Sequence, residues 1–191
     1  MKYFSSDFHI GHENVIKFSN RPFKDVEEMD KKIVDMVLDT VKKGDEIFFL
    51  GDLGFHPSPA IDRLFRELPK KVNFNWIIGN HDKKVLNHYK QFTNKLDFIM
   101  ETHITTEIGK QRIVMCHYPM LTWNQSFRGA WQLFGHHHAN GHEKNLLPNI
   151  LTGKMFNVNL EFNDYKMYDE NDLIRIMNKK PNNWDLLKDL T

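Results

Sequence analysis

Short apolar runs that end in Asp, Asn or His recur along this chain, and no other feature of the sequence restricts its fold as strongly. In one of them, residues 72–78 are followed by Gly79, Asn80, His81 and Asp82. An apolar run of this length, bounded by a glycine that allows a tight turn or a positive φ, is typical of a buried strand. Ligands of open α/β sheets bind at the carboxyl ends of such strands. The sequence therefore predicts an α/β fold with its chemistry at strand ends.

Four more apolar runs end in the same kinds of polar residue. Taken singly, each position has an ordinary explanation, because Asp and Asn are common in turns and isolated histidines occur in cores and on surfaces. The ordered recurrence is what favours a shared site. The polar residues that follow these four runs are Asp7 and His9, then Asp52, then His117, and finally His136 and His138.

Helical patterns alternate with the early strands, which predicts βαβ units. Asp25 can cap a helix that has Glu28 three residues later and an apolar stripe ending at Gly44. The other expected elements are helices over residues 58–68, 83–89 and 169–179, an antiparallel hairpin within residues 98–116, a loop over residues 118–130 at the rim of the site, and strands over residues 131–135 and 154–162.

Length and composition narrow the class of protein. The 191 residues predict one domain, over residues 1–191, and 40% hydrophobic with 27% charged residues are ordinary globular values. A net charge of +1 gives no general attraction to nucleic acid or membranes, and no apolar run is long enough for a membrane span. Cys116 is the single cysteine and the first residues lack a secretory apolar core, so the sequence predicts a cytoplasmic location.

The polar residues at the strand ends are metal ligands in character. Carboxylate, imidazole and amide groups suit borderline divalent ions such as manganese, iron, nickel or zinc, and the lack of cysteine ligands argues against a structural zinc site. More than four such ligands imply more than one ion. Side chains alternate along an extended segment, so Asp7 and His9 are expected on one side. His136 and His138 are expected to share a side in the same way, with His137 pointing away.

The polar blocks follow a recognisable order, which is D-x-H, G-D, G-N-H-D, H and G-H-x-H from Asp7 to His138. This order resembles that of calcineurin-like metallophosphoesterases, and the opening D-x-H-x-G-H-x-N followed by R-P-F is similar to small single-domain bacterial and phage phosphoesterases. The resemblance implies a four-layer α-β-β-α sandwich of two mixed sheets flanked by helices, and a metal-dependent phosphoric ester hydrolase. Purple acid phosphatases of the same superfamily carry a metal-binding tyrosine at the position of Phe55, so a tyrosinate-iron centre is not expected.

Seven of these side chains correspond to metal ligands of the family. The resemblance implies two divalent ions, with manganese favoured and iron, nickel or zinc as alternatives. A hydroxide that bridges the two ions would attack the phosphorus. The first ion would be bound by Asp7, His9 and His138, the second by Asn80, His117 and His136, and Asp52 would bridge them.

Two further residues correspond to catalytic positions of the family. His81 would protonate the departing oxygen or stabilise the charge of the transition state, and Asp82 would orient His81 by accepting a hydrogen bond. A phosphodiester or nucleotide is the preferred substrate, because an alkoxide leaving group benefits from a proton donor. His12, Asn14 and Arg21 lie in the loop after the first ligand pair and are candidate contacts for the substrate phosphate.

Other functions stay open at this point. A phosphomonoesterase is the nearest alternative. A short-oligonucleotide nuclease is another, because Trp123 and Trp131 could stack on bases, although no strongly basic stripe favours nucleic acid. A non-catalytic interaction scaffold on the same fold is the third, and the complete ligand set argues against it. The expected partner is a small phosphate ester or nucleotide, without a membrane, and the sequence leaves the oligomeric state open.

Overall fold

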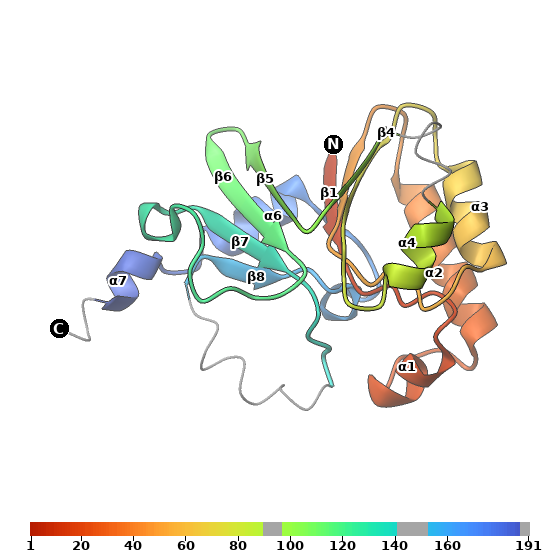
Figure 1. The fold of residues 1–191 in the computed structure, drawn as a ribbon. Coiled ribbons are helices and arrows are strands. Elements are labelled where there is room, and N and C mark those ends of the chain that lie inside the picture. The colour runs from red at the N-terminus through yellow and green to blue at the C-terminus, as the bar shows by residue number, and fades with distance from the viewer. Residues whose placement is uncertain (90–96, 141–152, 188–191) are drawn as a thin grey trace.

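Two β-sheets that face each other form the centre of the structure, a computed structural model that describes residues 1–89, 97–140 and 153–187 (Figure 1). The first sheet has the strand order β4-β3-β2-β1-β9 and the second β5-β6-β7-β8. The strands of the first sheet are β1 (Lys2–Ser5), β2 (Glu46–Phe49), β3 (Asn73–Ile77), β4 (Asp97–Glu101) and β9 (Tyr168–Asp169). Those of the second are β5 (His103–Ile108), β6 (Gln111–Cys116), β7 (Trp131–Phe134) and β8 (Met155–Asn157).

Parallel pairing aligns the carboxyl ends of the central strands. β1, β2 and β3 are paired in parallel, with Ser5 opposite Phe49 and Phe49 opposite Trp76. β6, β7 and β8 are also parallel, with Met115 opposite Leu133. The loops that follow these strands therefore start level with one another at one edge of each sheet.

Successive residues of a central strand are buried on opposite faces of the sheet. Phe48 belongs to the apolar cluster between the sheets, whereas Phe49 belongs to the cluster beneath the helices. This burial on both faces explains why the strands are uninterrupted apolar runs in the sequence. Each fully buried side chain of this size contributes roughly 1.5–3 kcal/mol, so the strands form a firm base for the loops at their ends.

Helices lie over the outer face of the first sheet (Figure 1). α2 begins as expected at Asp25, whose carboxylate accepts a hydrogen bond from the Glu28 N–H at 2.8 Å. It ends at Thr40 rather than near Gly44, because Val41 has an extended backbone. The helices of this layer are α1 (Glu13–Phe18), α2 (Val26–Thr40), α3 (Pro59–Glu67) and α4 (Lys83–Tyr89).

The second sheet is covered differently on its two faces. Ile113 and Met115 point into the cluster between the sheets, which also takes Leu173 from α6 (Glu170–Met177). Val114, on the other face, packs against Trp123 of the long loop between β6 and β7. That loop contains the 3-10 helix η2 (Ser126–Arg128), which contacts α7 (Asn183–Leu187).

The predicted fold class is confirmed, since two mixed sheets are flanked by helices (Figure 1). The antiparallel hairpin expected within residues 98–116 is confirmed as β5 and β6, although residues 97–101 form β4, which pairs in parallel with β3 in the first sheet. One predicted strand was wrong in its extent. The strand expected over residues 154–162 ends at Asn157, and the 3-10 helix η3 (Leu160–Asn163) follows, capped by Asn159.

The helices of the described residues are short. The longest, α2, has 15 residues. None of them has both the length and the apolar composition that crossing a bilayer requires.

Candidate metal centre

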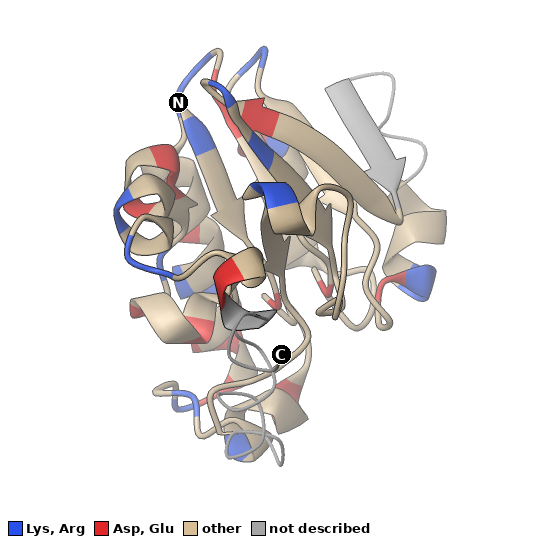
Figure 2. Cartoon of the chain, turned by 90° about the vertical axis from the view of Figure 1, so that its left-hand side faces the viewer, with Lys and Arg blue, Asp and Glu red and all other residues tan. Residues whose placement is uncertain are grey.

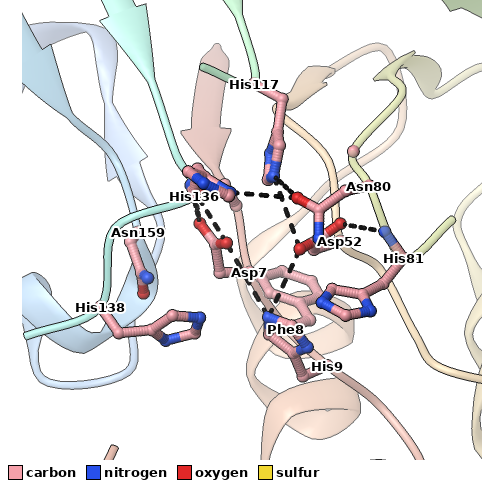
Figure 3. Close-up of polar contacts among 12 residues, drawn as sticks. Asp7, Phe8, His9, Asp52, Asn80, His81, His117, His136, His138 and Asn159 are labelled. Carbon is pink, nitrogen blue, oxygen red and sulfur yellow. Dashed lines mark hydrogen bonds and ion pairs between the residues drawn. The ribbon is translucent and has the colours of Figure 1, made fainter. Parts of the chain in front are cut away.

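The strand ends of both sheets bring the predicted metal-ligating side chains together (Figure 3). They come from the loops after β1, β2 and β3 in the first sheet and after β6 and β7 in the second. Asp7 accepts hydrogen bonds from the backbone N–H of His136 at 3.1–3.2 Å, which joins the two sheets directly at this point. The seven residues of this group are Asp7, His9, Asp52, Asn80, His117, His136 and His138.

Two sets of donors can be distinguished within the group. In the first, Asp7, His9 and His138 each offer one ligand atom, and these atoms lie within 4.8 Å of one another. In the second, the Asn80 Oδ1 atom lies 3.0 Å from His117 Nε2 and 3.0 Å from His136 Nδ1. Each set is compact enough to hold one ion.

Asp52 lies between the two sets. Its Oδ2 atom is 3.6 Å from His9 Nε2 and 3.5 Å from His117 Nε2. Its Oδ1 atom accepts a hydrogen bond of 2.9 Å from the His81 N–H, which fixes the direction of the carboxylate. One carboxylate oxygen therefore faces a histidine nitrogen of each set.

The chemistry of the donors fits divalent ions. His9 Nε2 is buried and has no hydrogen-bond partner among the described residues, although carboxylate oxygens of Asp52 and Asp7 lie within 3.9 Å. Burial, together with the nearby Arg21 guanidinium and neighbouring histidines, holds the pKa of His9 well below its usual range, so this imidazole is neutral. A buried nitrogen left without a partner costs about 1–3 kcal/mol. A cation between these groups would remove that cost.

The charges of the side chains in the centre also favour bound cations. Burial raises the pKa of Asp7, an effect that His117 and His138 oppose. Burial would lower the pKa of His117, but its contacts with the Asp52 and Asp7 carboxylates outweigh burial and raise it to about 9. Without a cation, the buried carboxylates thus depend on protonated histidines for compensation, and divalent ions would supply the positive charge directly.

The backbone that carries the ligands is not extended. The φ angles of Asp7, His9, Asp52 and His136 are 59°, 53°, 60° and 70°, which is the left-handed region. The expectation that an extended segment puts Asp7 and His9 on one side is therefore wrong in its geometry, although both side chains do face the centre. Residues other than glycine cost about 1–3 kcal/mol each in such conformations. Hydrogen bonds from the Asp7 N–H to Gly51 O and from the His9 N–H to Asp52 O, at 2.9 and 3.0 Å, hold the segment there.

Two positions in the centre require glycine, because a carboxylate lies too close to the backbone there for any side chain. Gly79 does not have the positive φ that its sequence context allows, but a Cβ atom there would lie 2.2 Å from Asp52 Oδ1. A Cβ atom at Gly135 would lie 2.6 Å from Asp7 Oδ2. Each glycine therefore leaves room for a carboxylate of the centre.

His81 lies beside the centre, and its neighbour Asp82 has a different role from the predicted one. The Asp82 carboxylate is fully buried and accepts hydrogen bonds from the N–H groups of Asp52, Leu53 and Gly79 at 2.7–2.9 Å and from Trp76 Nε1 at 3.1 Å. No hydrogen bond joins it to the His81 ring in the described part of the chain, so the prediction that it orients His81 is wrong. Burial raises the pKa of Asp82 to about 6 despite these bonds. Asp82 instead fixes the backbone of two ligand-bearing loops.

Replacing Asp82 with asparagine is expected to destabilise the metal-free protein. The amide has one acceptor oxygen in place of two and would turn N–H groups towards N–H donors that now end on the carboxylate. Buried donors left unpaired cost about 1–3 kcal/mol each, and one such loss corresponds to a melting temperature lower by roughly 2–12 °C for a domain of this size. Thermal unfolding followed by circular dichroism measures this. The control is Asp39→Asn on the exposed side of α2, and equal melting temperatures for the two variants would contradict the role of Asp82.

The three candidate substrate contacts lie in different environments. Arg21 is buried, and its guanidinium donates to Glu161 Oε1 at 2.8 Å, to Phe8 O at 2.8 Å and to Asp7 O at 2.7 Å. The prediction that Arg21 contacts substrate is therefore wrong. His12 is half-buried, with its Nδ1 atom 3.3 Å from His9 Nδ1, and Asn14 is exposed on α1. Both stay predictions.

Two residues near the ligands were not predicted. The side chain of Glu161, on η3, is buried and accepts a hydrogen bond from His138 Nδ1 at 2.7 Å. A strand was expected over this part of the chain, so the turn that brings Glu161 to His138 was not predicted. The local sequence signal for that turn is Asn159, which caps η3. Tyr118 is 45% exposed, and its ring centre lies 4.7 Å from that of His136 and 5.0 Å from that of His117, which puts it at the rim of the site.

The charged residues on one side of the molecule do not favour a nucleic-acid partner. On the side shown in Figure 2, the Lys and Arg residues that the structure describes are interspersed with Asp and Glu and form no continuous basic stripe. Trp123 and Trp131, which could have stacked on bases, are 8% and 3% exposed and belong to the cores. The stacking role considered for these two tryptophans is wrong.

Comparison with known proteins agrees with the geometry. Residues 3–158 match the model of the calcineurin-like phosphoesterase superfamily domain. An uncharacterized protein of Methanocaldococcus jannaschii is 32% identical over 179 residues, which are 93% of this chain and 91% of that protein. The crystal structure of a protein of unknown function from Aquifex aeolicus is similar, with a TM-score of 0.68, 25% identity, and coverage of 92% of this chain and 98% of that one. The chain belongs to the calcineurin-like phosphoesterase superfamily, and it is a metal-dependent phosphoester hydrolase.

Proposed function

We propose that this hydrolase acts through two divalent ions and prefers a phosphodiester or nucleotide, within a single domain over residues 1–191. The observation that carries the proposal is the place of Asp52, whose Oδ2 atom lies 3.5–3.6 Å from a histidine nitrogen of each donor set. A single-ion site would not need a carboxylate shared between two sets. Manganese is the favoured ion, with iron, nickel or zinc as alternatives, because all suit nitrogen and oxygen ligands.

The proposal includes a set of ligands for each ion. Divalent ions bound here would lower the pKa of a water molecule and offset negative charge on the phosphoryl oxygens. Asp52 would bridge the two ions, and the Asp82 carboxylate holds its backbone in place. The first ion would be bound by Asp7, His9 and His138, and the second by Asn80, His117 and His136.

His81 supplies the preference for a diester in this proposal. Its ring centre lies 5.3 Å from that of His9, and its N–H is bonded to Asp52, so its position is tied to the centre. Its ring makes no hydrogen bond to any described residue, which leaves it available to substrate. A proton donor there matters most when the leaving group is an alkoxide, as in a phosphodiester or nucleotide.

The alternatives are less well supported. A phosphomonoesterase would use the same ligands and differs only in the ester it prefers. A short-oligonucleotide nuclease loses support, since the two tryptophans considered for base stacking are buried. A non-catalytic scaffold would have no need of a complete ligand set. The partner is therefore a small phosphate ester, and the cytoplasmic location stays a prediction from the sequence.

Metal removal is expected to abolish hydrolysis and metal return to restore it. Metal-stripped protein would be resupplied with manganese, nickel or zinc and assayed with bis(p-nitrophenyl) phosphate and p-nitrophenyl phosphate. Loss of several kcal/mol of transition-state stabilisation predicts a fall of more than about 100-fold. Two ions should bind per chain, and the diester should be the faster substrate. Saturation at one ion would contradict the two-ion proposal, and faster monoester hydrolysis would identify a phosphomonoesterase.

A further inference from the structure

A buried ion pair lies directly behind the first donor set. Glu161 and Arg21 are 2% and 0% exposed at their side chains, and the Arg21 Nε atom donates to Glu161 Oε1 at 2.8 Å. The second carboxylate oxygen of Glu161 accepts a hydrogen bond from the Ala139 N–H at 2.9 Å. The backbone of Glu161 is held in turn by the side chain of Asn159, at 2.9 Å. The ion pair is therefore a fixed part of the fold.

We propose that Glu161 is a positioning residue for His138, and that Arg21 couples it to the Asp7–His9 segment, so that this ion pair sets the affinity of the first metal site. The proposal deepens the function proposed above and rests on its assignment of the ligands. It concerns one site of the two.

The carboxylate selects the nitrogen that His138 can offer to an ion. A neutral imidazole has one N–H and one lone pair. The His138 Nδ1 atom lies 2.7 Å from Glu161 Oε1, so the proton belongs on Nδ1 and the lone pair on Nε2. A carboxylate behind a ligating histidine fixes the tautomer and the ring orientation, and makes the other nitrogen a better ligand. Glu161 thus acts on the metal site through His138.

The guanidinium supports the other two ligands. Arg21 donates to the carbonyl oxygens of Asp7 and Phe8 at 2.7 and 2.8 Å. These carbonyls belong to the segment in which Asp7 and His9 have left-handed backbones. Strained conformations persist where the surroundings hold them firmly. One ion pair therefore contacts the segments that carry all three ligands of the first site.

The second donor set is fixed by a different contact. His117 Nδ1 lies 2.7 Å from Leu50 O, at the end of β2. With Nδ1 used in that contact, Nε2 of His117 faces Asn80. Leu50 O therefore has the same effect on His117 as Glu161 has on His138. Loss of Glu161 should consequently weaken the first site more than the second.

The test is a titration of the Glu161→Gln variant with manganese alone, measured by isothermal titration calorimetry. We expect one ion to bind about 10–100-fold more weakly, while the other changes less than threefold. The matched control is Glu67→Gln, which removes an Arg–Glu pair on the exposed side of α3, where Arg63 Nε lies 3.1 Å from Glu67. Equal weakening of both ions, or of neither, would overturn the proposal. A wild type that binds one ion contradicts the two-ion function, and Glu161→Gln would still weaken that ion.

A second measurement needs no variant. Nitrogen-15 NMR of the zinc-loaded wild type reports which imidazole nitrogen of His138 carries the proton. We expect the proton on Nδ1. A proton on Nε2 would overturn the proposal, and this result holds even where Glu161→Gln fails to fold.

Discussion

Asparagine in place of Asp52 is expected to lower phosphodiester hydrolysis by at least about 1,000-fold, which is about 4 kcal/mol of transition-state stabilisation. The substitution keeps the shape of the side chain and removes its charge. Asp52 Oδ1 accepts a hydrogen bond from the His81 N–H, so the asparagine oxygen can keep that contact. Its NH2 group would then lie where Oδ2 now faces His9 and His117 at 3.6 and 3.5 Å. A donor at that point cannot bind an ion.

Metal binding separates this effect from a general loss of structure. We expect Asp52→Asn to bind one ion per chain, or two with affinity reduced by more than about tenfold, while the far-ultraviolet circular dichroism is unchanged. Asp39→Asn, at an exposed site on α2, is the control and should behave as wild type. If Asp52→Asn keeps two ions and turns over within tenfold of wild type, Asp52 does not bridge.

The grouping of the candidate ligands at one place could be predicted because each of them follows a strand within a few residues. Asp7, Asp52, Asn80 and His117 all come directly after strands whose apolar character is visible in the sequence. Parallel strands end at the same edge, so local patterns are enough to predict a shared site. The structure gathers all of these residues (Figure 3), as the motif order indicates.

The supporting contacts could not be predicted in the same way. Glu161 lies 23 positions after His138 and reaches it only because the chain turns into η3. Arg21 is a candidate substrate contact in the sequence, since nothing local shows that its guanidinium is enclosed by Glu161 and two carbonyls. Such contacts depend on tertiary packing, which overrides local preference.

The same limit applies to backbone geometry and to Asp82. The alternation of side chains along a strand predicts that Asp7 and His9 face the same side, which is correct. The reason is wrong, because left-handed φ angles turn both residues inward and the segment is not extended. The resemblance to the family implies a hydrogen bond between His81 and Asp82. Four donors from other segments occupy the carboxylate instead. Sequence neighbours need not be partners at a tight turn.

His81→Ala is expected to slow substrates according to their leaving group. A phosphodiester with an alkoxide leaving group, such as a cyclic nucleotide, should lose about 100- to 10,000-fold, the usual contribution of a general acid. Bis(p-nitrophenyl) phosphate should lose less than about tenfold, because an aryl oxide leaves without a proton. The physical basis is that the His81 ring, half-buried beside His9, has no hydrogen bond to any described residue, while its backbone is tied to Asp52.

Comparison of the two esters makes His81→Ala a test of chemistry and not of folding, because a damaged metal centre would slow both substrates alike. His88→Ala, at an exposed position of α4, is the matched control and should leave both rates unchanged. His12→Ala is a second comparison, since the His12 ring centre lies 6.0 Å from that of His81 and could share the role. Equal losses on both esters for His81→Ala would reject it as the proton donor. A leaving-group dependence in His12→Ala instead would assign the proton to His12.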